Sequence, residues 1–284
     1  MDGVPLVSVL MTAFNREKYI SEAIESVLKS TYDNWELIIV DDCSIDNTVS
    51  IAKKYSAKDS RVKIFINEKN LGDYPNRNRA ASYASGKYLQ YLDSDDTIFD
   101  DSLTKIIELA KRFPDVGIFM CSLSNKVEYT PAIEAVSKHF FEKQFLYYGP
   151  GGTFLKRDFF VLMGGYPEKY GPANDMYFNL KAACSTAIVT HPYDLIFYRQ
   201  HPGQESKAEF TYIIENYRYM RDALDELPLP FSQKEIKWLR KKNYRRFVVN
   251  LFHYCKRNGN IGKIKLAWQK ADFKYQYLFQ GIFH

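Results

Sequence analysis

The stretch KYLQYLDSDD at residues 87–96 joins an apolar run to a dense group of acids. Its first six residues have the composition of a buried strand, and Asp93, Asp95 and Asp96 follow directly. Repulsion among three carboxylates at the end of a buried strand destabilises the fold unless a cation offsets it. Mg²⁺ and Mn²⁺ take such oxygen ligands, typically together with substrate phosphates. A solvated acidic turn that caps the next helix is the alternative.

Short apolar runs alternate with amphipathic segments on both sides of this stretch. Strands are predicted at residues 6–11, 36–40, 62–67, 87–92 and 116–121, and helices at 18–30, 46–58, 76–85 and 101–113. This alternation predicts an α/β fold, a mostly parallel sheet with helices on both faces. Ligands of such sheets bind beyond the carboxyl ends of the strands. We expect three polar groups to meet there, at residues 12–15, 41–42 and 93–96.

The second half of the chain is less regular. Glycine-rich loops are predicted at residues 147–153 and 164–174, a helix at 175–183, an extended segment at 188–198, and helices from 205 onward with breaks at 227–230 and 258–260. Gly151 and Gly152 in the first loop have two interpretations of equal weight. Either they let the backbone approach an acceptor, or they only form a turn.

The composition is that of a globular protein, with 46% hydrophobic and 26% charged residues. The four cysteines, Cys43, Cys121, Cys184 and Cys255, are widely spaced and form no CxxC pair, which predicts free thiols in a reducing compartment. Residues 1–5 do not begin a signal peptide, and no apolar run approaches the roughly 18 residues of a spanning helix. We therefore expect a cytoplasmic protein.

The net charge of +5 is unevenly distributed. Residues 205–284 hold 16 lysines and arginines against 8 aspartates and glutamates, so the rest of the chain is slightly acidic. Aromatic residues are interleaved with the basic ones. A basic amphipathic helix can lie on an anionic membrane, whereas a helical cap with solvated lysines explains the same pattern, and we favour the cap slightly. Nucleic-acid binding ranks last because no known module supports it.

Five segments in order resemble glycosyltransferase family 2, whose fold is called GT-A. They are VSVLMTAFN (7–15), ELIIVDDCSIDNT (36–48), NLGDYPNRNRAASYASGKYLQYLDSDD (70–96), GPAND (171–175) and YRQH (198–201). The resemblance implies a Rossmann-like GT-A domain at residues 1–204, with a nucleotide-binding half (1–121) and an acceptor half (122–204). A basic helical extension follows at residues 205–284.

The resemblance also implies the residues that hold the nucleotide. Thr12, Phe14 and Asp42 match positions that hold the base, with Asp42 accepting a hydrogen bond from a uracil ring nitrogen. The family often has Tyr in place of Phe14, so stacking on the base is kept and a hydroxyl contact is lost. Arg77 matches an arginine that contacts the nucleotide. A helix-capping role for Ser44 or Asp46 leaves Asp42 free to bind a ligand.

The metal and the diphosphate are assigned in the same way. Asp93-Ser94-Asp95 matches the DxD motif of the family, with Asp93 near the ribose and the metal, Ser94 at the donor, and Asp95 on the metal. Arg199 and His201 match a pair that reaches the donor diphosphate, and His201 is also a candidate metal ligand. The alternative for His201 is an ordinary surface histidine. The implied cofactor is Mn²⁺ or Mg²⁺.

Asp175 matches the catalytic base of the family. The family usually has Glu-Asp at this point, whereas this chain has Asn174-Asp175, so the base is kept and its neighbour changes. A second role for Asp175, compatible with the first, is to cap the helix that follows. The resemblance also implies that one such base, acting opposite the leaving group, inverts the anomeric centre.

Together these features favour an inverting transferase that moves a sugar from a UDP-sugar, or another nucleotide-diphosphate sugar, to a saccharide or lipid-linked acceptor. Polysaccharide or glycolipid assembly is the expected setting, with peripheral contact at the inner membrane face and no nucleic-acid partner. One alternative is a non-catalytic sugar-nucleotide-binding protein. Another is a nucleotidyltransferase, although that class usually has a glycine-rich phosphate loop near the N-terminus, which this chain lacks.

Overall fold

The centre of the molecule is an eight-stranded sheet. The structure, a computed structural model, describes residues 3–201 and 209–282. From one edge to the other its strands are β3 (Val62–Ile66), β2 (Trp35–Asp41), β1 (Val7–Ala13), β4 (Tyr88–Asp93), β8 (Thr153–Lys156), β6 (Ile118–Cys121), β9 (Ile188–His191) and β7 (Glu128–Thr130). The first four strands pair in parallel. The predicted α/β fold is confirmed.

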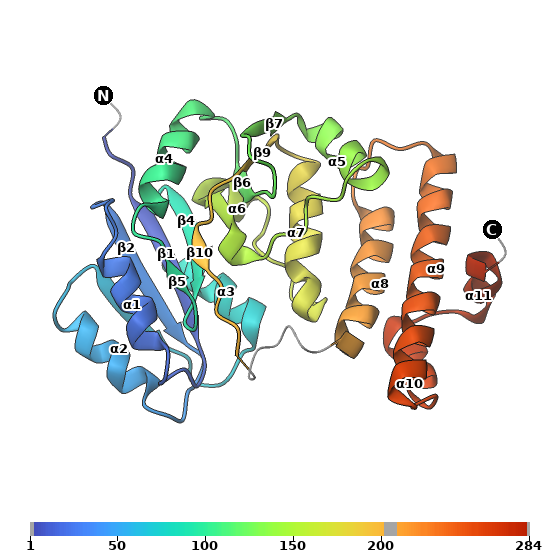
Figure 1. Cartoon of the computed structure of the whole chain (residues 1–284), viewed down its shortest axis with the longest axis horizontal. Coiled ribbons are helices and arrows are strands. Elements are labelled where there is room, and N and C mark those ends of the chain that lie inside the picture. The colour runs from blue at the N-terminus through green and yellow to red at the C-terminus, as the bar shows by residue number, and fades with distance from the viewer. Residues whose placement is uncertain (1–2, 202–208, 283–284) are drawn as a thin grey trace.

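Both faces of the parallel half are covered, as Figure 1 shows. On one face Val9 and Met11 pack with α1 (Ile20–Leu28), α2 (Thr48–Ser56) and α4 (Ser102–Arg112). On the other, Leu10 packs in a cluster that includes α3 (Asp73–Ser82) and α7 (Asn174–Ala183). Successive strand residues point to opposite faces. Strands buried on both faces are therefore continuously apolar, which is the pattern that made them visible in the sequence.

The second half of the sheet departs from simple β-α alternation. Strand β8 runs antiparallel between β4 and β6, and β7 runs antiparallel to β9 at the edge. A separate antiparallel pair joins β5 (Thr97–Ile98) to β10 (Ile196–Phe197). The remaining elements of this half are α5 (Ala132–Phe141), α6 (Arg157–Leu162), and two short 3₁₀ turns, η1 (Pro150–Gly152) and η2 (Gly171–Ala173). The sequence did not predict β8, α5 or α6.

The last described residues form a helical unit that packs against α7 (Figure 1). It comprises α8 (Glu209–Glu226), α9 (Gln233–Asn258), α10 (Lys263–Ala271) and α11 (Tyr275–Ile282). Helix α9 begins at a capping box formed by Ser232 and Glu235 and ends at Gly259, whose φ of 62° lies in the left-handed region. Both predicted breaks are confirmed. The predicted domain boundary, at residues 204–205, lies outside the described residues.

Aromatic side chains of the extension form a core of their own. Tyr217 of α8 packs on Phe247 of α9 and on Phe273, with ring centroids 4.7 and 5.4 Å apart. All four cysteines are free thiols, as predicted. Within the described part of the chain, no helix combines the length and the hydrophobicity that crossing a bilayer requires.

Candidate active site

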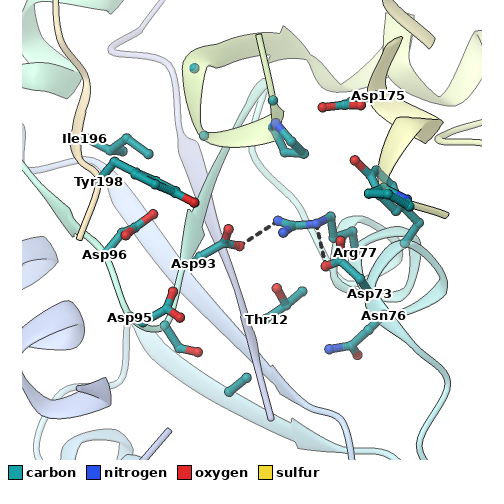
Figure 2. A pocket seen from close by; sticks show the side chains of 18 of the residues that line it. Thr12, Asp73, Asn76, Arg77, Asp93, Asp95, Asp96, Asp175, Ile196 and Tyr198 are labelled. Carbon is teal, nitrogen blue, oxygen red and sulfur yellow. Dashed lines mark ion pairs between the residues drawn. The ribbon is translucent and has the colours of Figure 1, made fainter. Parts of the chain in front are cut away.

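A cavity of about 590 Å³ lies at the carboxyl ends of β1, β2 and β4. Figure 2 shows that the acidic side chains after β4 and the side chain of Asp175 line different parts of its wall. Eight of the residues proposed from the sequence line this cavity: Thr12, Phe14, Asp42, Arg77, Asp93, Ser94, Asp95 and Asp175. The three polar groups that follow the strands therefore meet at one edge of the sheet, as predicted.

The acids after β4 form a tight group. Asp93, Asp95 and Asp96 each offer one carboxylate oxygen, and these oxygens lie within 4.8 Å of one another. Burial, together with the charges of Asp93 and Asp95, raises the pKa of Asp96 to about 7, although a hydrogen bond from the Arg199 backbone opposes the shift. Three oxygen ligands at this spacing suit a hard divalent cation.

Basic side chains from distant segments contact the Asp95 carboxylate. Arg16 Nε donates to Asp95 Oδ2 at 2.9 Å, and His201 Nε2 lies 2.9 Å from the same oxygen. The His201 ring stacks on Tyr19, with ring centroids 4.9 Å apart. His201 therefore lies beside a carboxylate of the DxD segment, and it is not an isolated surface histidine.

Arg199 holds the same group of acids through two hydrogen bonds that each involve a backbone atom. Its amide donates to Asp96 Oδ1, and its Nε donates to the Asp95 carbonyl oxygen, both at 2.9 Å. Its Nη2 pairs with Glu22 at the surface, at 2.6 Å. Arg199 and His201 thus meet the DxD segment, although neither lines the cavity directly.

Arg77 of α3 is buried between two carboxylates. Its Nε lies 2.8 Å from Asp73 Oδ1, and its Nη1 lies 2.7 Å from Asp93 Oδ1, as the dashed lines in Figure 2 mark. Burial alone would lower the pKa of Arg77, but the two carboxylates outweigh it and raise that pKa, so the side chain keeps its charge. This arrangement ties α3 to the end of β4.

Asp42 is held by the loop that precedes α3. Its oxygens accept hydrogen bonds from Asn67 Nδ2 and from the amides of Leu71 and Gly72, at 2.7 to 2.9 Å. The sequence predicted a side chain free to bind a ligand. The structure instead commits three of about four acceptor positions of this carboxylate to the loop. A contact with a nucleotide base would use the position that remains.

Asp175 is buried in the cavity wall at the start of α7. Its Oδ1 accepts from the Met176 amide at 2.8 Å, and the Tyr74 hydroxyl is another hydrogen-bond partner. Burial raises the pKa of Asp175 to about 7, against the Met176 hydrogen bond, which lowers it. The N-cap of α7 is Ala173, without a side-chain capping bond. Asp175 therefore has a pKa close to neutral pH, and it is not the residue that caps the helix.

The sequence model of glycosyl transferase family 2 matches residues 8–164, more than half of the chain. The chain belongs to glycosyl transferase family 2. WfgD of Escherichia coli, a UDP-Glc:α-D-GlcNAc-diphosphoundecaprenol β-1,3-glucosyltransferase, is 50% identical over 91 residues, which are 32% of this chain and 35% of WfgD. TuaG of Bacillus subtilis is 42% identical over 104 residues, 37% of this chain and 41% of TuaG. These matches thus span well under half the length of either relative.

Solved glycosyltransferases share the fold. S. aureus TarS 1–349 in complex with UDP-GlcNAc has a TM-score of 0.72 at 20% identity, covering 96% of this chain and 81% of that one. The mannosyltransferase PcManGT of Pyrobaculum calidifontis, in complex with GDP-Man and Mn²⁺, has a TM-score of 0.67 at 15% identity, covering 99% and 84%. The expected GT-A fold is confirmed.

Several residues of the cavity were not proposed from the sequence, among them Arg16, Tyr74 and Tyr212. Arg16 follows the first strand motif by a single residue, and that position was the only signal for it. Tyr74 lies within the quoted motif of α3 but was given no role. Tyr212 reaches the cavity from α8, so the C-terminal extension contributes to the site. No local pattern could have revealed Tyr212, because it is far from the other motifs in the chain.

The two glycines of the 147–153 loop also line the cavity. A Cβ on Gly151 would lie 2.4 Å from Ile196 Cδ1, and one on Gly152 would lie 3.1 Å from Tyr148 Cδ1. Gly151 therefore permits close packing of β10 against the loop, and the space above it is already filled. That observation favours a structural role for Gly151 over direct approach of an acceptor.

Proposed function

We propose that this chain transfers a sugar from a UDP-sugar, or another nucleotide-diphosphate sugar, to an acceptor hydroxyl with inversion. The observation that carries the proposal is the single cavity that holds a cluster of three carboxylates and, elsewhere in its wall, a buried carboxyl group with a pKa near 7. The first group suits a metal and a diphosphate, and the second suits a proton acceptor.

The donor set fits a divalent cation. Asp93 and Asp95 would hold Mn²⁺ or Mg²⁺, with His201 as a further candidate ligand beside Asp95. When bound, such an ion would neutralise negative charge on the departing diphosphate. PcManGT, which shares the fold, was solved with Mn²⁺, and this supports the assignment.

The nucleotide would lie along the ends of β1, β2 and β4. Phe14 offers a face for the base, Thr12 and Asp42 offer polar atoms beside it, and Ser94 faces the donor. Arg77 is buried between Asp73 and Asp93, so its contribution is to keep Asp93 in place. Arg199 holds the DxD segment in place through its contacts with Asp95 and Asp96. The names of WfgD and of the TarS complex favour UDP over other nucleotides.

Asp175 would act as the general base. The acceptor hydroxyl forms a new bond to the anomeric carbon while the bond to the diphosphate oxygen breaks, and the hydroxyl proton passes to Asp175. A base works best when its pKa lies near the working pH, and burial places Asp175 there. Because a single displacement occurs opposite the leaving group, the anomeric configuration inverts.

The acceptor would enter beside Asp175. Aromatic and apolar side chains line the cavity from the acceptor half and from α8: Tyr148, Pro172, Ile196, Tyr198 and Tyr212. Aromatic rings are suited to the apolar faces of sugar rings. Together with WfgD, whose name specifies an undecaprenol-linked acceptor, this wall favours a saccharide or lipid-linked saccharide in polysaccharide or glycolipid assembly.

Calorimetric titration with UDP tests the donor site. We expect binding with Mn²⁺ that is lost with a chelator and in Asp95→Ala, whereas Asp158→Ala on the surface of α6, whose side chain is 93% exposed, should bind like the wild type. If another nucleotide diphosphate binds and UDP does not, the assignment of uracil as the base is wrong, but the proposed transferase activity still stands. Failure of every nucleotide to bind would overturn the proposed function.

Asp175→Asn separates catalysis from binding. Asn keeps the size of the side chain and its acceptor for the Met176 amide, so UDP affinity should stay unchanged while transfer falls at least about 10³-fold.

The raised pKa also means that the ionised Asp175 destabilises the fold as the pH rises from about 4 through 7. The variant should therefore melt no lower than the wild type at pH 8. Full transfer by this variant would exclude Asp175 as the base, and wild-type protein that binds UDP without any turnover would indicate a non-catalytic binder.

A further inference from the structure

The segment that forms most of α9 and all of α10 is rich in basic residues and contains no acidic ones. Residues 236–271 hold eleven lysines and arginines and no aspartate or glutamate. Two ion pairs reach this segment from α8, Arg240 with Asp225 and Arg257 with Glu209. Of the other nine basic residues, six lie on α9 and three on α10, so these two helices carry a strong positive charge.

One face of α9 explains only part of this composition. Ile236, Leu239, Tyr244, Phe247 and Leu251 are buried, in contact with the rest of the helical unit. This face is the helical cap that the sequence favoured. It accounts for two of the five aromatic residues of α9 and leaves the basic residues unexplained.

The opposite face carries a second, regular pattern. Six residues recur at spacings of three and four, and these we name the outer stripe: Trp238, Lys242, Arg245, Val249, Phe252 and Lys256. Such spacing aligns side chains along one side of a helix. The three apolar members are 50%, 43% and 60% exposed, and the three basic members are also exposed. Lys242 Nζ lies 4.9 Å from the ring centroid of Trp238, so charge and aromatic surface are interleaved.

We propose that the outer stripe of α9 docks the protein on an anionic lipid bilayer. A bilayer interface takes up apolar side chains while its anionic headgroups attract lysines and arginines, so it satisfies both halves of the pattern at once. A second copy of the chain would bring two basic stripes together, and their charges repel. A nucleic acid would engage the basic side chains but would leave Val249 and Phe252 in water.

The position of the stripe relative to the cavity supports the same partner. Its last turn leads to Arg257, which pairs with Glu209 at the start of α8, and Lys263 Nζ lies 4.9 Å from the ring centroid of Phe210. Tyr212, on the same first turns of α8, lines the cavity. Figure 1 shows that α9 runs antiparallel to α8, so the end of α9 lies beside the start of α8. The C-terminal end of the stripe thus lies near the end of α8 that carries Tyr212.

Vesicle sedimentation of the full chain tests the proposal. We expect the wild type to sediment with vesicles of phosphatidylcholine and phosphatidylglycerol, and to do so much less with phosphatidylcholine alone or in 0.5 M salt. Lys242→Glu with Lys256→Glu should weaken binding by about tenfold or more. Trp238→Ser with Phe252→Ser should weaken it several-fold at unchanged charge.

Each variant has a matched control elsewhere. Lys53→Glu with Lys54→Glu on exposed positions of α2 makes the same charge change, and Ile45→Ser with Leu123→Ser removes apolar residues that are 91% and 84% exposed. Both controls should bind vesicles like the wild type. The charge variant should also keep its melting temperature and its UDP affinity, which makes this result independent of the proposed transferase activity.

Three outcomes would overturn the proposal. The first is equal loss in the α2 control, which would mean that net charge alone drives binding. The second is absence of vesicle binding by the wild type at low salt. The third is tighter binding to a single-stranded oligonucleotide than to anionic vesicles, with the outer-stripe variants affecting both alike.

Discussion

At the carboxyl end of β2, Asp41 and Asp42 accept hydrogen bonds from neutral donors of nearby loops. Asp41 binds the amide and hydroxyl of Ser44, and Asp42 binds Asn67 and two loop amides. At the carboxyl end of β4, Asp93 and Asp95 instead contact charged or ionisable side chains. Arg77 pairs with the first, and Arg16 and His201 meet the second.

This difference separates carboxylates that mainly hold a loop from carboxylates that keep their charge for a ligand. Neutral donors satisfy a carboxylate where it stands, and they shape the loop that supplies them. Three crowded carboxylates at the end of β4 keep excess negative charge, and burial with the neighbouring acids raises the pKa of Asp96 to about 7. Clustered acids with a perturbed pKa inside a cavity indicate a ligand site.

The largest expected effect is on activity at the end of β4. Asp95→Asn removes one charge and keeps the shape of the side chain, so we expect transfer to fall by about 10²–10³-fold. The free energy of unfolding should change by less than about 1.5 kcal/mol, because Arg16 is partly exposed and can be solvated. Transfer assays and urea unfolding measure the two quantities. A large loss of stability with activity kept would mean that Asp95, at the end of β4, serves the fold and not the ligand.

The next effect is on stability at the end of β2. Asp42→Ala leaves the Leu71 and Gly72 amides and the Asn67 side chain without their acceptor, and we expect the free energy of unfolding to fall by about 2–4 kcal/mol. Urea unfolding measures it, with the surface change Asp158→Ala as the control. A loss below about 1 kcal/mol would show that Asp42 is not needed to hold the loop, and that it is available mainly for a ligand.

The comparison also explains what the sequence could reveal. Strands buried on both faces are continuously apolar, so the residues that follow each strand could be assigned to one edge of the sheet. Which side chains reach those residues depends on how other segments fold back on them, as Arg16 does on Asp95. Tyr212 likewise lines the cavity from α8. The loop that surrounds Asp42 was equally invisible, because its amides act through backbone geometry. Strand β8 was missed since its four residues lie between a glycine-rich loop and a short helix.

A third carboxyl group, Asp175, combines the two kinds of environment. Like Asp42 it accepts neutral hydrogen bonds, and like Asp96 it has a pKa raised by burial. Tyr74→Phe removes a hydroxyl that favours the ionised form, so the pKa of Asp175 should rise above about 7. Transfer should then fall about three- to tenfold at pH 7 and much less at pH 9, as a pH–rate profile would show. An equal loss at all pH values would mean that Tyr74 acts only through packing.

The smallest expected effect concerns the surface contact of Arg199. Its ion pair with Glu22 is exposed, with 62% of the Glu22 side chain accessible, so Glu22→Gln should change the free energy of unfolding by less than about 1 kcal/mol and transfer by less than about twofold. Arg199→Gln should cost more, because its Nε also donates to the Asp95 carbonyl. If instead the two variants lose the same activity, Arg199 acts through its surface ion pair with Glu22. Its contact with Asp95 would then not belong to the charged environment that matters at the end of β4. Transfer assays on both variants decide this, since the backbone amide that binds Asp96 is common to them.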